Sequence, residues 1–252
     1  MNGEITDMRI ISIANHKGGV GKTTTTAALG VALSQLGRSV LLIDLDPQGN
    51  LSQTLSVPQG GRTIYEAMTE ERNLPIVEVS PSLSVCPSSL DLVSADIELG
   101  GRPERGTILR ELLSPLRYDY ILIDCPPSLG LLLINAFTAS TEVFIPIVPE
   151  ALPAKGLGTL REMIGKVQGG LNPPLSLSGI IITRYQRRKI NRIVEETLRE
   201  SFGDIVFKTR IRENVDISES PLAGQDILSY SPNSIGAEDY RSLALEVDKK
   251  QE

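Results

Sequence analysis

The sequence predicts an α/β fold with a mostly parallel, twisted β-sheet and helices on both of its faces. Short apolar runs of strand length alternate with longer stretches whose apolar residues recur at helical spacing. This alternation is typical of consecutive βαβ units. The first apolar run also leads into a glycine-rich loop and then a helix, which places that loop at the carboxyl edge of the sheet.

The expected strands are apolar runs bounded by turn or helix signals, as in a buried parallel sheet. The first and fourth are rich in isoleucine, and the second and fourth end on aspartate. In chain order they are Arg9–Ala14, Ser39–Asp44, Leu83–Pro87, Tyr120–Asp124, Val143–Val148 and Gly179–Thr183.

The expected helices lie between these runs and after the last one. The first ends before Gly37, a suitable residue for the position after a helix. The helical stretches are Thr24–Leu36, Thr107–Leu116, Leu131–Ser140, Leu157–Gln168, Asn191–Phe202 and Ala237–Lys249. The turn-rich segment Val57–Arg62 is expected to be a surface loop.

The glycine-rich loop spans His16–Thr24 and reads HKGGVGKTT. Its glycines allow successive N–H groups to point into one concavity that suits a phosphate group. Lys22 can reach the β- and γ-phosphates, and the hydroxyl of Thr23 can bind Mg²⁺. These features predict a P-loop and a P-loop NTPase-type sheet. The expected nucleotide contacts come from Lys17, Gly18, Gly19, Val20, Gly21, Lys22, Thr23 and Thr24.

The loop departs from the standard G-x-x-x-x-G-K-[ST] spacing at its start. His16 stands where the first glycine belongs, and a second lysine, Lys17, follows it. Lys22 already serves the phosphates of its own site, so Lys17 would contribute more across an interface, as an arginine finger does. From position alone, a solvated surface lysine is an equal alternative.

Three aspartates lie at or just beyond the ends of two of the expected strands. Asp124 closes one strand and is assigned as the Walker B acid, which holds Mg²⁺ through water. Asp44 and Asp46 close another; one can lie near the metal while the other positions an attacking water. Taken singly, each aspartate could instead cap a helix or stabilise a turn. Their presence beside a P-loop favours a site that binds ATP and Mg²⁺.

Bulk properties exclude several classes of protein. The 252 residues suit one large α/β domain over 1–252, with residues 1–8 as a flexible lead-in. The net charge of −6 argues against a uniformly basic nucleic-acid binder. Cys86 and Cys125 lack CxxC spacing, so neither a disulfide scaffold nor a zinc site is expected. No signal peptide and no membrane span is visible, which favours the cytoplasm.

Residues 184–212 are locally basic, with nine Lys or Arg residues against four acids. Their net charge of +5 leaves about −11 for the remainder of the chain. This asymmetry predicts a phosphate-facing patch that binds DNA without sequence preference and in a salt-sensitive way. A solvated helix face is the alternative. The residues assigned to DNA binding are Arg187, Arg188, Lys189 and Arg192.

Three motifs together carry a resemblance to a known family. They are KGGVGKTT at 17–24, DLDPQGN at 44–50 and IDCPPSLG at 123–130. The set resembles the ParA/Soj family of partition ATPases, which belongs with MinD to the deviant Walker A group. The likeness runs from about Arg9 to Val247.

The resemblance implies roles for the site residues. Lys17 matches the signature lysine that reaches the phosphates of a dimer partner, and Asp46 matches the hydrolysis-critical acid. Asp44 lies near the metal shell, and Asp124 matches the Walker B acid. The region that surrounds adenine corresponds to Thr183, Arg184 and the 211–215 segment, which includes Arg212 and Asn214.

The family likeness also implies a working cycle. ATP would drive a sandwich homodimer that binds DNA non-specifically, and a ParB-like partner would stimulate slow hydrolysis. The protein would then be cytoplasmic, nucleoid-associated and active in plasmid or chromosome partition. No N-terminal helix-turn-helix domain is expected. The tail 243–252 has too little apolar surface for a membrane-targeting helix.

Three other functions remain open from the sequence. The chain could position a protein cargo by the same cycle. It could be a nucleotide-gated binding or regulatory protein with negligible turnover. A metallo-cofactor scaffold or reductase ATPase is the third alternative, although its expected cysteine pattern is absent.

Overall fold

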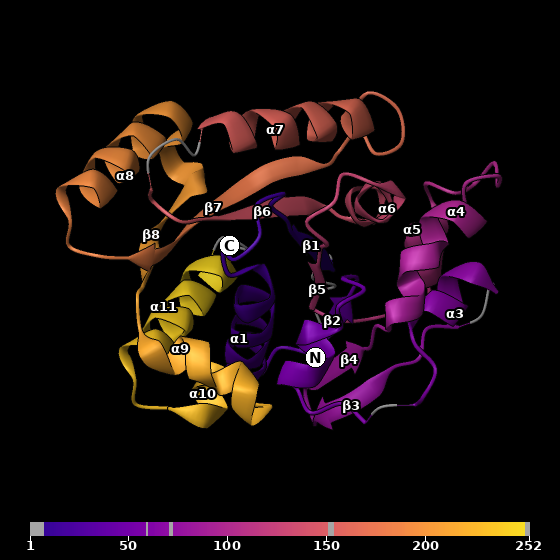
Figure 1. Ribbon diagram of the computed structural model, residues 1–252, viewed down its shortest axis with the longest axis horizontal. Helices are drawn as coiled ribbons and strands as arrows, with labels where there is room; N and C mark the ends of the chain where they lie inside the picture. The colour runs from indigo at the N-terminus through magenta and orange to yellow at the C-terminus, as the bar shows by residue number, and fades with distance from the viewer. Residues whose placement is uncertain (1–7, 59, 71–72, 151–153, 250–252) are drawn as a thin grey trace, which may run out of the picture.

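The computed structural model describes residues 8–58, 60–70, 73–150 and 154–249, with side chains from residue 157 onward in the last range. The strands of these described residues form one eight-stranded sheet, in the order β3-β4-β2-β5-β1-β6-β7-β8 (Figure 1). Only the β3–β4 pair is antiparallel, so the expected mostly parallel sheet is confirmed. The strands are β1 Arg9–Ile13, β2 Val40–Asp44, β3 Val77–Ser80, β4 Leu83–Cys86, β5 Tyr120–Asp124, β6 Glu142–Ile147, β7 Ser176–Tyr185 and β8 Val206–Arg212.

Helices cover both faces of this sheet, as the alternating pattern predicted. The longer ones are α1 Lys22–Gln35, α6 Leu131–Ala139, α7 Ala154–Gln168, α8 Lys189–Phe202 and α11 Ile235–Lys249. The shorter helices are α2 Asn50–Thr54, α3 Ile64–Thr69, α4 Ala95–Glu98, α5 Ile108–Leu113, α9 Val215–Glu219 and α10 Ile227–Tyr230. Three 3₁₀ segments complete the described elements: η1 Leu90–Ser94, η2 Gly203–Ile205 and η3 Ser220–Ala223.

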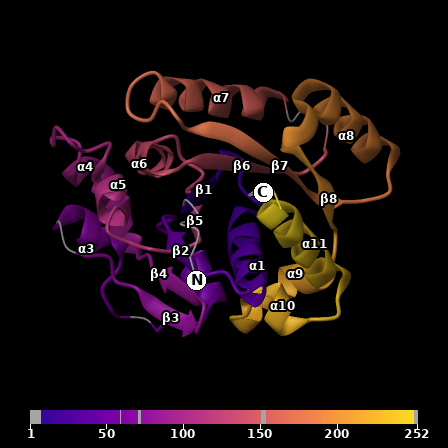
Figure 2. The same ribbon diagram turned by 180° about the vertical axis from the view of Figure 1, so that it is seen from behind.

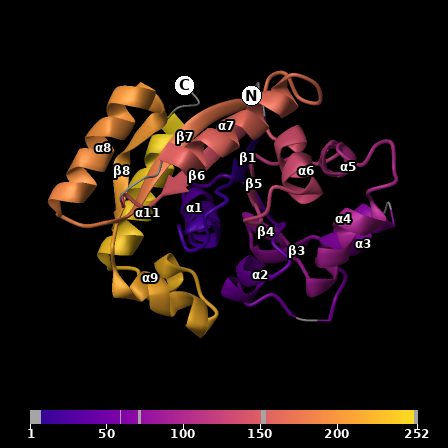
Figure 3. The same cartoon turned by 45° about the horizontal axis from the view of Figure 1, so that its top comes forward.

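The sheet separates two apolar cores. Successive residues of a strand face opposite sides. Ile121 and Ile123 of β5 therefore join the core under α5, α6 and α7. Tyr120 and Leu122 join the core under α1 and α11. Seen from behind, α1 and α11 lie side by side (Figure 2), and from above α7 runs over β6 and β7 (Figure 3).

Two strands were not expected from the sequence. β8 falls inside the basic stretch, and it reads VFKTRIR, in which charged residues interrupt the apolar run. β3 reads VEVS and is only partly buried. Both lie at the edges of the sheet, where one side of a strand faces solvent and a continuous apolar run is not required. The expected lead-in, residues 1–8, falls outside the described residues apart from Met8.

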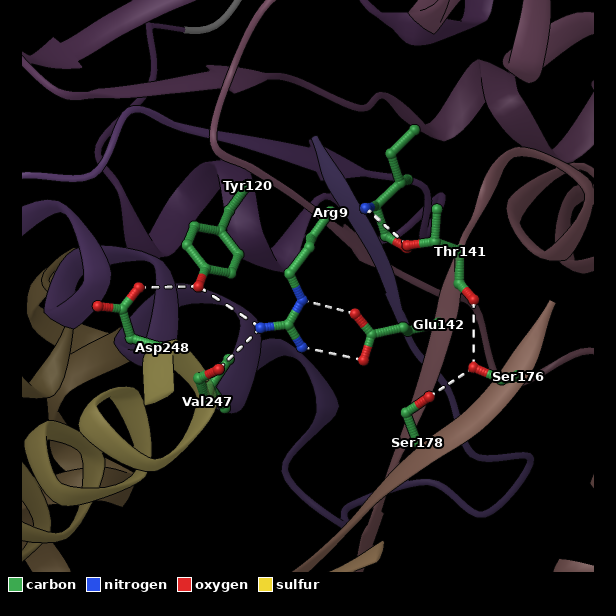
Figure 4. A network of polar contacts seen from close by, with 9 residues as sticks. Arg9, Tyr120, Thr141, Glu142, Ser176, Ser178, Val247 and Asp248 are labelled. Carbon is green, nitrogen blue, oxygen red and sulfur yellow. Dashed lines mark hydrogen bonds and ion pairs between the residues drawn. The ribbon is translucent and has the colours of Figure 1, made fainter. Parts of the chain in front are cut away.

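A polar network holds the amino edge of the sheet to the end of α11 (Figure 4). The Arg9 guanidinium donates to Glu142 Oε1 at 2.6 Å and Oε2 at 2.9 Å, and to the Val247 carbonyl at 2.7 Å. The Tyr120 hydroxyl donates to Asp248 Oδ1 at 2.9 Å. This network ties β1, β5 and β6 to α11 at the end opposite the glycine-rich loop, and so fixes the frame on which the loop is built.

Candidate functional site

The glycine-rich loop joins the carboxyl end of β1 to the start of α1. Gly19 and Gly21 have φ values of +70° and +88°, which other residues adopt only with strain. Gly21 also precedes α1 without a side chain that could cap it, so the N–H groups of the first turn remain available to a ligand. Such a turn, with positive dipole character, favours a phosphate group.

The polar residues of the loop are held in place by neighbouring strands. Lys22 is only 8% exposed, although it opens a helix. Thr183 at the end of β7 donates its hydroxyl to the Val20 carbonyl at 2.9 Å. Asn15 accepts the Lys17 N–H at 3.0 Å and donates to the Pro146 carbonyl at 2.8 Å. Hydrogen bonds to β6 and β7 therefore fix the conformation of the loop without a bound ligand.

Asp124 lies buried at the end of β5 beside the loop. Neither of its carboxylate oxygens has a hydrogen-bond partner among the described residues, although the side chain is fully buried. Burial raises the pKa of Asp124 well above its usual range, and the charge of Asp44 raises it further, while Thr23 and Lys22 act in the opposite direction. A buried carboxylate without partners, next to a threonine hydroxyl, fits a divalent cation.

Asp44 faces Asp124 in the register of β2 with β5. Its Oδ2 accepts bonds from the Ser52 N–H at 2.9 Å and the Ser52 hydroxyl at 2.7 Å. Burial raises the pKa of Asp44 to about 6, and these two bonds partly oppose the rise. Ser52 belongs to α2, and sequence reasoning did not identify it, because no motif marks a serine eight residues after the aspartate. The structure thus adds a partner that fixes the orientation of Asp44.

Asp46 lies in the turn that follows β2 and is 8% exposed. Its Oδ1 accepts the N–H of Gln48 at 3.0 Å, and its own N–H donates to Asp44 at 3.3 Å. The two aspartates are therefore linked through the backbone. Among the described residues, no three His, Cys, Asp or Glu side chains gather as a metal cage. A cation here would need oxygens from Thr23, phosphate groups and water.

Lys17 sits at the exposed mouth of the loop. Its Nζ lies 3.2 Å from Glu150 Oε2, and both side chains are 60% exposed. Glu150 follows β6 and was not singled out from the sequence. The expected signature amine is thus held by a carboxylate of its own chain.

A cavity of about 380 Å³ adjoins the loop. Its lining includes Gly19, Gly21, Thr24, Thr183, Arg184, Arg212, Asn214 and Tyr240. Asn214 Oδ1 is buried there without a hydrogen-bond partner in the described part of the chain. Tyr240 is a lining residue that the sequence did not reveal, because a buried aromatic residue on α11 looks like any other core residue.

The cations assigned to the base-binding region are engaged by acids. Arg184 adopts a φ of +50° and lies 3.4 Å from Glu213. Arg212 contacts Asp239 at 2.6 Å and Glu238 at 2.7 Å, and these contacts raise the pKa of its guanidinium. The cavity wall therefore carries fixed, paired charges instead of free cations.

Several cations of the basic stretch are paired with acids, so fewer of them are available than the count of lysines and arginines suggests. Arg199 and Arg210 both contact Glu195, which is 4% exposed, at 2.9 Å and 2.7 Å. Arg192 lies 3.9 Å from Glu196. Within the described residues, the cations that have no ion pair near the start of α8 are Arg187, Arg188 and Lys189. The predicted patch is thus concentrated in the turn before α8 and at the first residue of that helix.

One further result concerns the length of the helices. In the described ranges, none is both long and apolar enough to cross a bilayer.

Comparisons with known proteins agree with this geometry. A family model described as an AAA domain matches residues 8–177. The chain is 41% identical over 256 residues to the chromosome partitioning protein ParA of Caulobacter vibrioides, covering 97% of this chain and 95% of that one. It is 40% identical over 245 residues to the chromosome-partitioning ATPase Soj of Treponema pallidum, covering 95% of this chain and 96% of the other.

The fold also matches solved structures. Cobyrinic acid a,c-diamide synthase from Mycobacterium smegmatis, solved with bound ADP and magnesium, superposes with a TM-score of 0.84 at 32% identity. The match covers 96% of this chain and 94% of that one. Identity of about 40% over nearly the whole length, together with the loop and the three aspartates, shows that the chain belongs to the ParA/Soj family of partition ATPases.

Proposed function

We propose that this protein is an ATPase that uses Mg²⁺ and ATP to switch between states in partition or cargo positioning. The observation that carries the proposal is Asp124, whose buried carboxylate has no hydrogen-bond partner in the described structure and lies near Lys22 and Thr23. Relatives of this fold have been solved with ADP, an ATP analog and magnesium. The two cores share one sheet, which supports a single ATPase domain over 1–252.

Each polar group of the site has a role in binding. The N–H groups of the loop and the Lys22 amine bind the phosphates. The Thr23 hydroxyl would hold Mg²⁺ directly, and Asp124 would hold it through water. Asp44 lies next to Asp124 on the neighbouring strand. The bound ion would neutralise charge on the β- and γ-phosphates. Asn214 offers a buried acceptor to the exocyclic amine of adenine in the adjoining cavity, beside Thr183, Arg184 and Arg212.

Asp46 is suited to orient the attacking water. It begins the turn after β2, is nearly buried, and is held by the Gln48 N–H. A carboxylate fixed in this way can accept a hydrogen bond from water and align it with the γ-phosphate. This assignment distinguishes an ATPase from a nucleotide-gated protein with negligible turnover.

The switch would act through dimerisation. Two copies would close around two ATP molecules, and each Lys17 would leave Glu150 to contact the partner's phosphates. The γ-phosphate would then hold the dimer together, and loss of this phosphate on hydrolysis would let the two subunits separate. The ATP-bound dimer would bind DNA without sequence preference through Arg187, Arg188 and Lys189, and Arg192 would join them by leaving its exposed pair with Glu196. A ParB-like or cargo-adaptor protein would stimulate hydrolysis, and the protein would act in the cytoplasm on the nucleoid.

The proposal is tested by ATP turnover and ATP binding in matched variants. Asp46→Ala is expected to keep ATP affinity within about threefold. Its turnover should fall by about two orders of magnitude or more, which is the usual effect of losing a group that positions water. Lys22→Ala is expected to lose both. Turnover in Asp46→Ala equal to that of the unaltered protein would contradict the assignment. Mg²⁺-independent turnover would contradict the cofactor.

A further inference from the structure

The segment formed by η1 and α4 carries two apolar stripes instead of one. Its inner stripe, Leu92, Ala95 and Leu99, is fully buried in the core. Its outer stripe repeats the same three- and four-residue spacing at Leu90, Val93 and Ile97, which are 67%, 60% and 84% exposed. Polar residues normally occupy the outward face of a surface helix.

A fourth exposed apolar residue belongs to the loop after β5, which adjoins α4. Asp96 of α4 lies against the backbone of Gly130, so closely that a Cβ at Gly130 would collide with its carboxylate. The preceding residue, Leu129, is 40% exposed. The loop after β5 thus abuts α4, and it carries a further exposed apolar residue. Exposed apolar residues that gather on one part of a surface mark an interaction site.

The charged residues within this segment are all acidic. Residues Leu90–Leu99 include Asp91, Asp96 and Glu98, all exposed, and contain no lysine or arginine. The next cations along the chain are turned to backbone carbonyls. Arg102 donates to Thr69 and Arg105 donates to Gly100. An apolar stripe with an acidic rim is complementary to a helix that carries apolar residues at the same spacing and cations beside them.

We propose that Leu90, Val93 and Ile97, with Leu129, form a docking surface for a basic amphipathic helix of a partner protein. The biological role of this docking rests on the proposed function, since it describes the kind of segment that a hydrolysis-stimulating partner would present. The position supports that role. The Ser88 N–H, two residues before the stripe, donates to Ser52 Oγ at 3.1 Å, and Ser52 holds Asp44. Gly130, on the other side, belongs to the loop that follows Asp124.

The test uses the full chain and a fluorescently labelled peptide of about 18 residues, long enough to form a helix, with leucines at helical spacing and flanking lysines. A peptide of the same composition in scrambled order is the reference. Fluorescence anisotropy gives both affinities. We expect the amphipathic peptide to bind at least about tenfold more tightly than the scrambled one, because only the ordered pattern matches the stripe.

Two substitutions locate the binding site. Val93→Ser/Ile97→Ser is expected to weaken binding of the amphipathic peptide by about tenfold, as truncation of central apolar contacts does. Leu36→Ser/Leu245→Ser removes two residues that are 41% and 47% exposed, one just after α1 and one on α11, and is expected to leave the affinity unchanged. Asp91→Asn/Asp96→Asn is expected to reduce the affinity severalfold and to weaken its salt dependence.

Three results would overturn the docking surface. One is equal binding of the ordered and scrambled peptides. Another is equal loss of affinity in the two double serine variants. The third is loss of self-association in Val93→Ser/Ile97→Ser with unchanged peptide affinity, which would assign the stripe to a second copy of this chain. ATP turnover measured on the same samples separates the two proposals. Turnover without peptide binding rejects the docking surface alone, and peptide binding without turnover rejects the ATPase proposal alone.

Discussion

Lys17 forms an ion pair with Glu150 across the mouth of the nucleotide-binding loop, with Nζ and Oε2 3.2 Å apart. The two residues follow β1 and β6, which are neighbours in the sheet. If Lys17 serves the phosphates of a second copy, this pair must break when the dimer closes. Glu150 then acts as a competitor for the amine.

Glu150→Gln should therefore favour dimerisation. An exposed pair contributes at most about 1 kcal/mol, so the gain should not exceed roughly fivefold in the dimer dissociation constant. Sedimentation equilibrium with Mg·ATP in an Asp46→Ala background measures it. Glu196→Gln, which removes the weaker pair with Arg192, is the matched control and should have no effect. Weaker dimerisation in Glu150→Gln would show that Glu150 supports closure.

Asp124→Asn should exchange activity for stability. An amide in place of a buried carboxylate removes a charge that has no hydrogen-bond partner in the described structure and that lies near Asp44. We expect the ligand-free protein to gain about 1–2 kcal/mol in its free energy of unfolding. ATP turnover should fall by at least about tenfold, because the site loses the negative charge that would help to hold Mg²⁺. Urea denaturation measures the stability, and phosphate release measures the turnover. A loss of stability in Asp124→Asn would contradict the view that the unpartnered carboxylate destabilises the ligand-free protein.

Much of this site could be predicted from the sequence. The loop, Asp44, Asp46 and Asp124 stand in motifs whose residues are close along the chain, so spacing alone reveals them. Ser52, Glu150 and Tyr240 were not predicted, because each reaches the site only through the folding of a separate element. The edge strand β8 was missed since its charged residues break the apolar run.

The basic stretch shows why counting charges has limits. Its net charge was correct, but Glu195 is buried between Arg199 and Arg210 and neutralises part of it. Pairing across α8 and β8 leaves no trace in the sequence. The structure therefore reduces the candidate DNA-binding surface to fewer cations than the count suggested.

Arg187→Glu/Arg188→Glu should weaken DNA binding. Because binding rests on phosphate contacts, we expect a loss of about tenfold or more at low salt and a salt slope smaller by roughly two. A mobility-shift titration at several salt concentrations, with Mg·ATP and the Asp46→Ala background, measures both. Arg117→Glu/Lys166→Glu changes the net charge equally at exposed positions elsewhere. Equal loss in both double variants would indicate a general charge effect.

Asp248 should contribute a pH-dependent part of the stability. Burial acts to raise its pKa, but bonds from Arg38 and Tyr120 outweigh it, so the pKa of Asp248 is lowered. A lowered pKa in the folded state means that the contribution is present above the ordinary value near about 3.9 and is lost as the pH falls below it.

The variant Asp248→Asn should thus lose about 1–2 kcal/mol near neutral pH. Its difference from the unaltered protein should shrink as the pH falls from about 5 toward 3. Urea midpoints across this range measure the effect, and Glu162→Gln on the exposed side of α7 serves as the control. A difference that stays constant with pH would show that the network in Figure 4 stabilises through packing alone.

The proposed ATP-dependent dimer is tested most directly by the solution mass of Asp46→Ala at saturating Mg·ATP, measured by light scattering beside the double variant Lys17→Ala/Asp46→Ala. We expect twice the 27.3 kDa subunit mass for the first protein and the mass of one subunit for the second. Single subunits in both samples would contradict a dimer closed around ATP, and dimers in both would contradict the role of Lys17 in closing it.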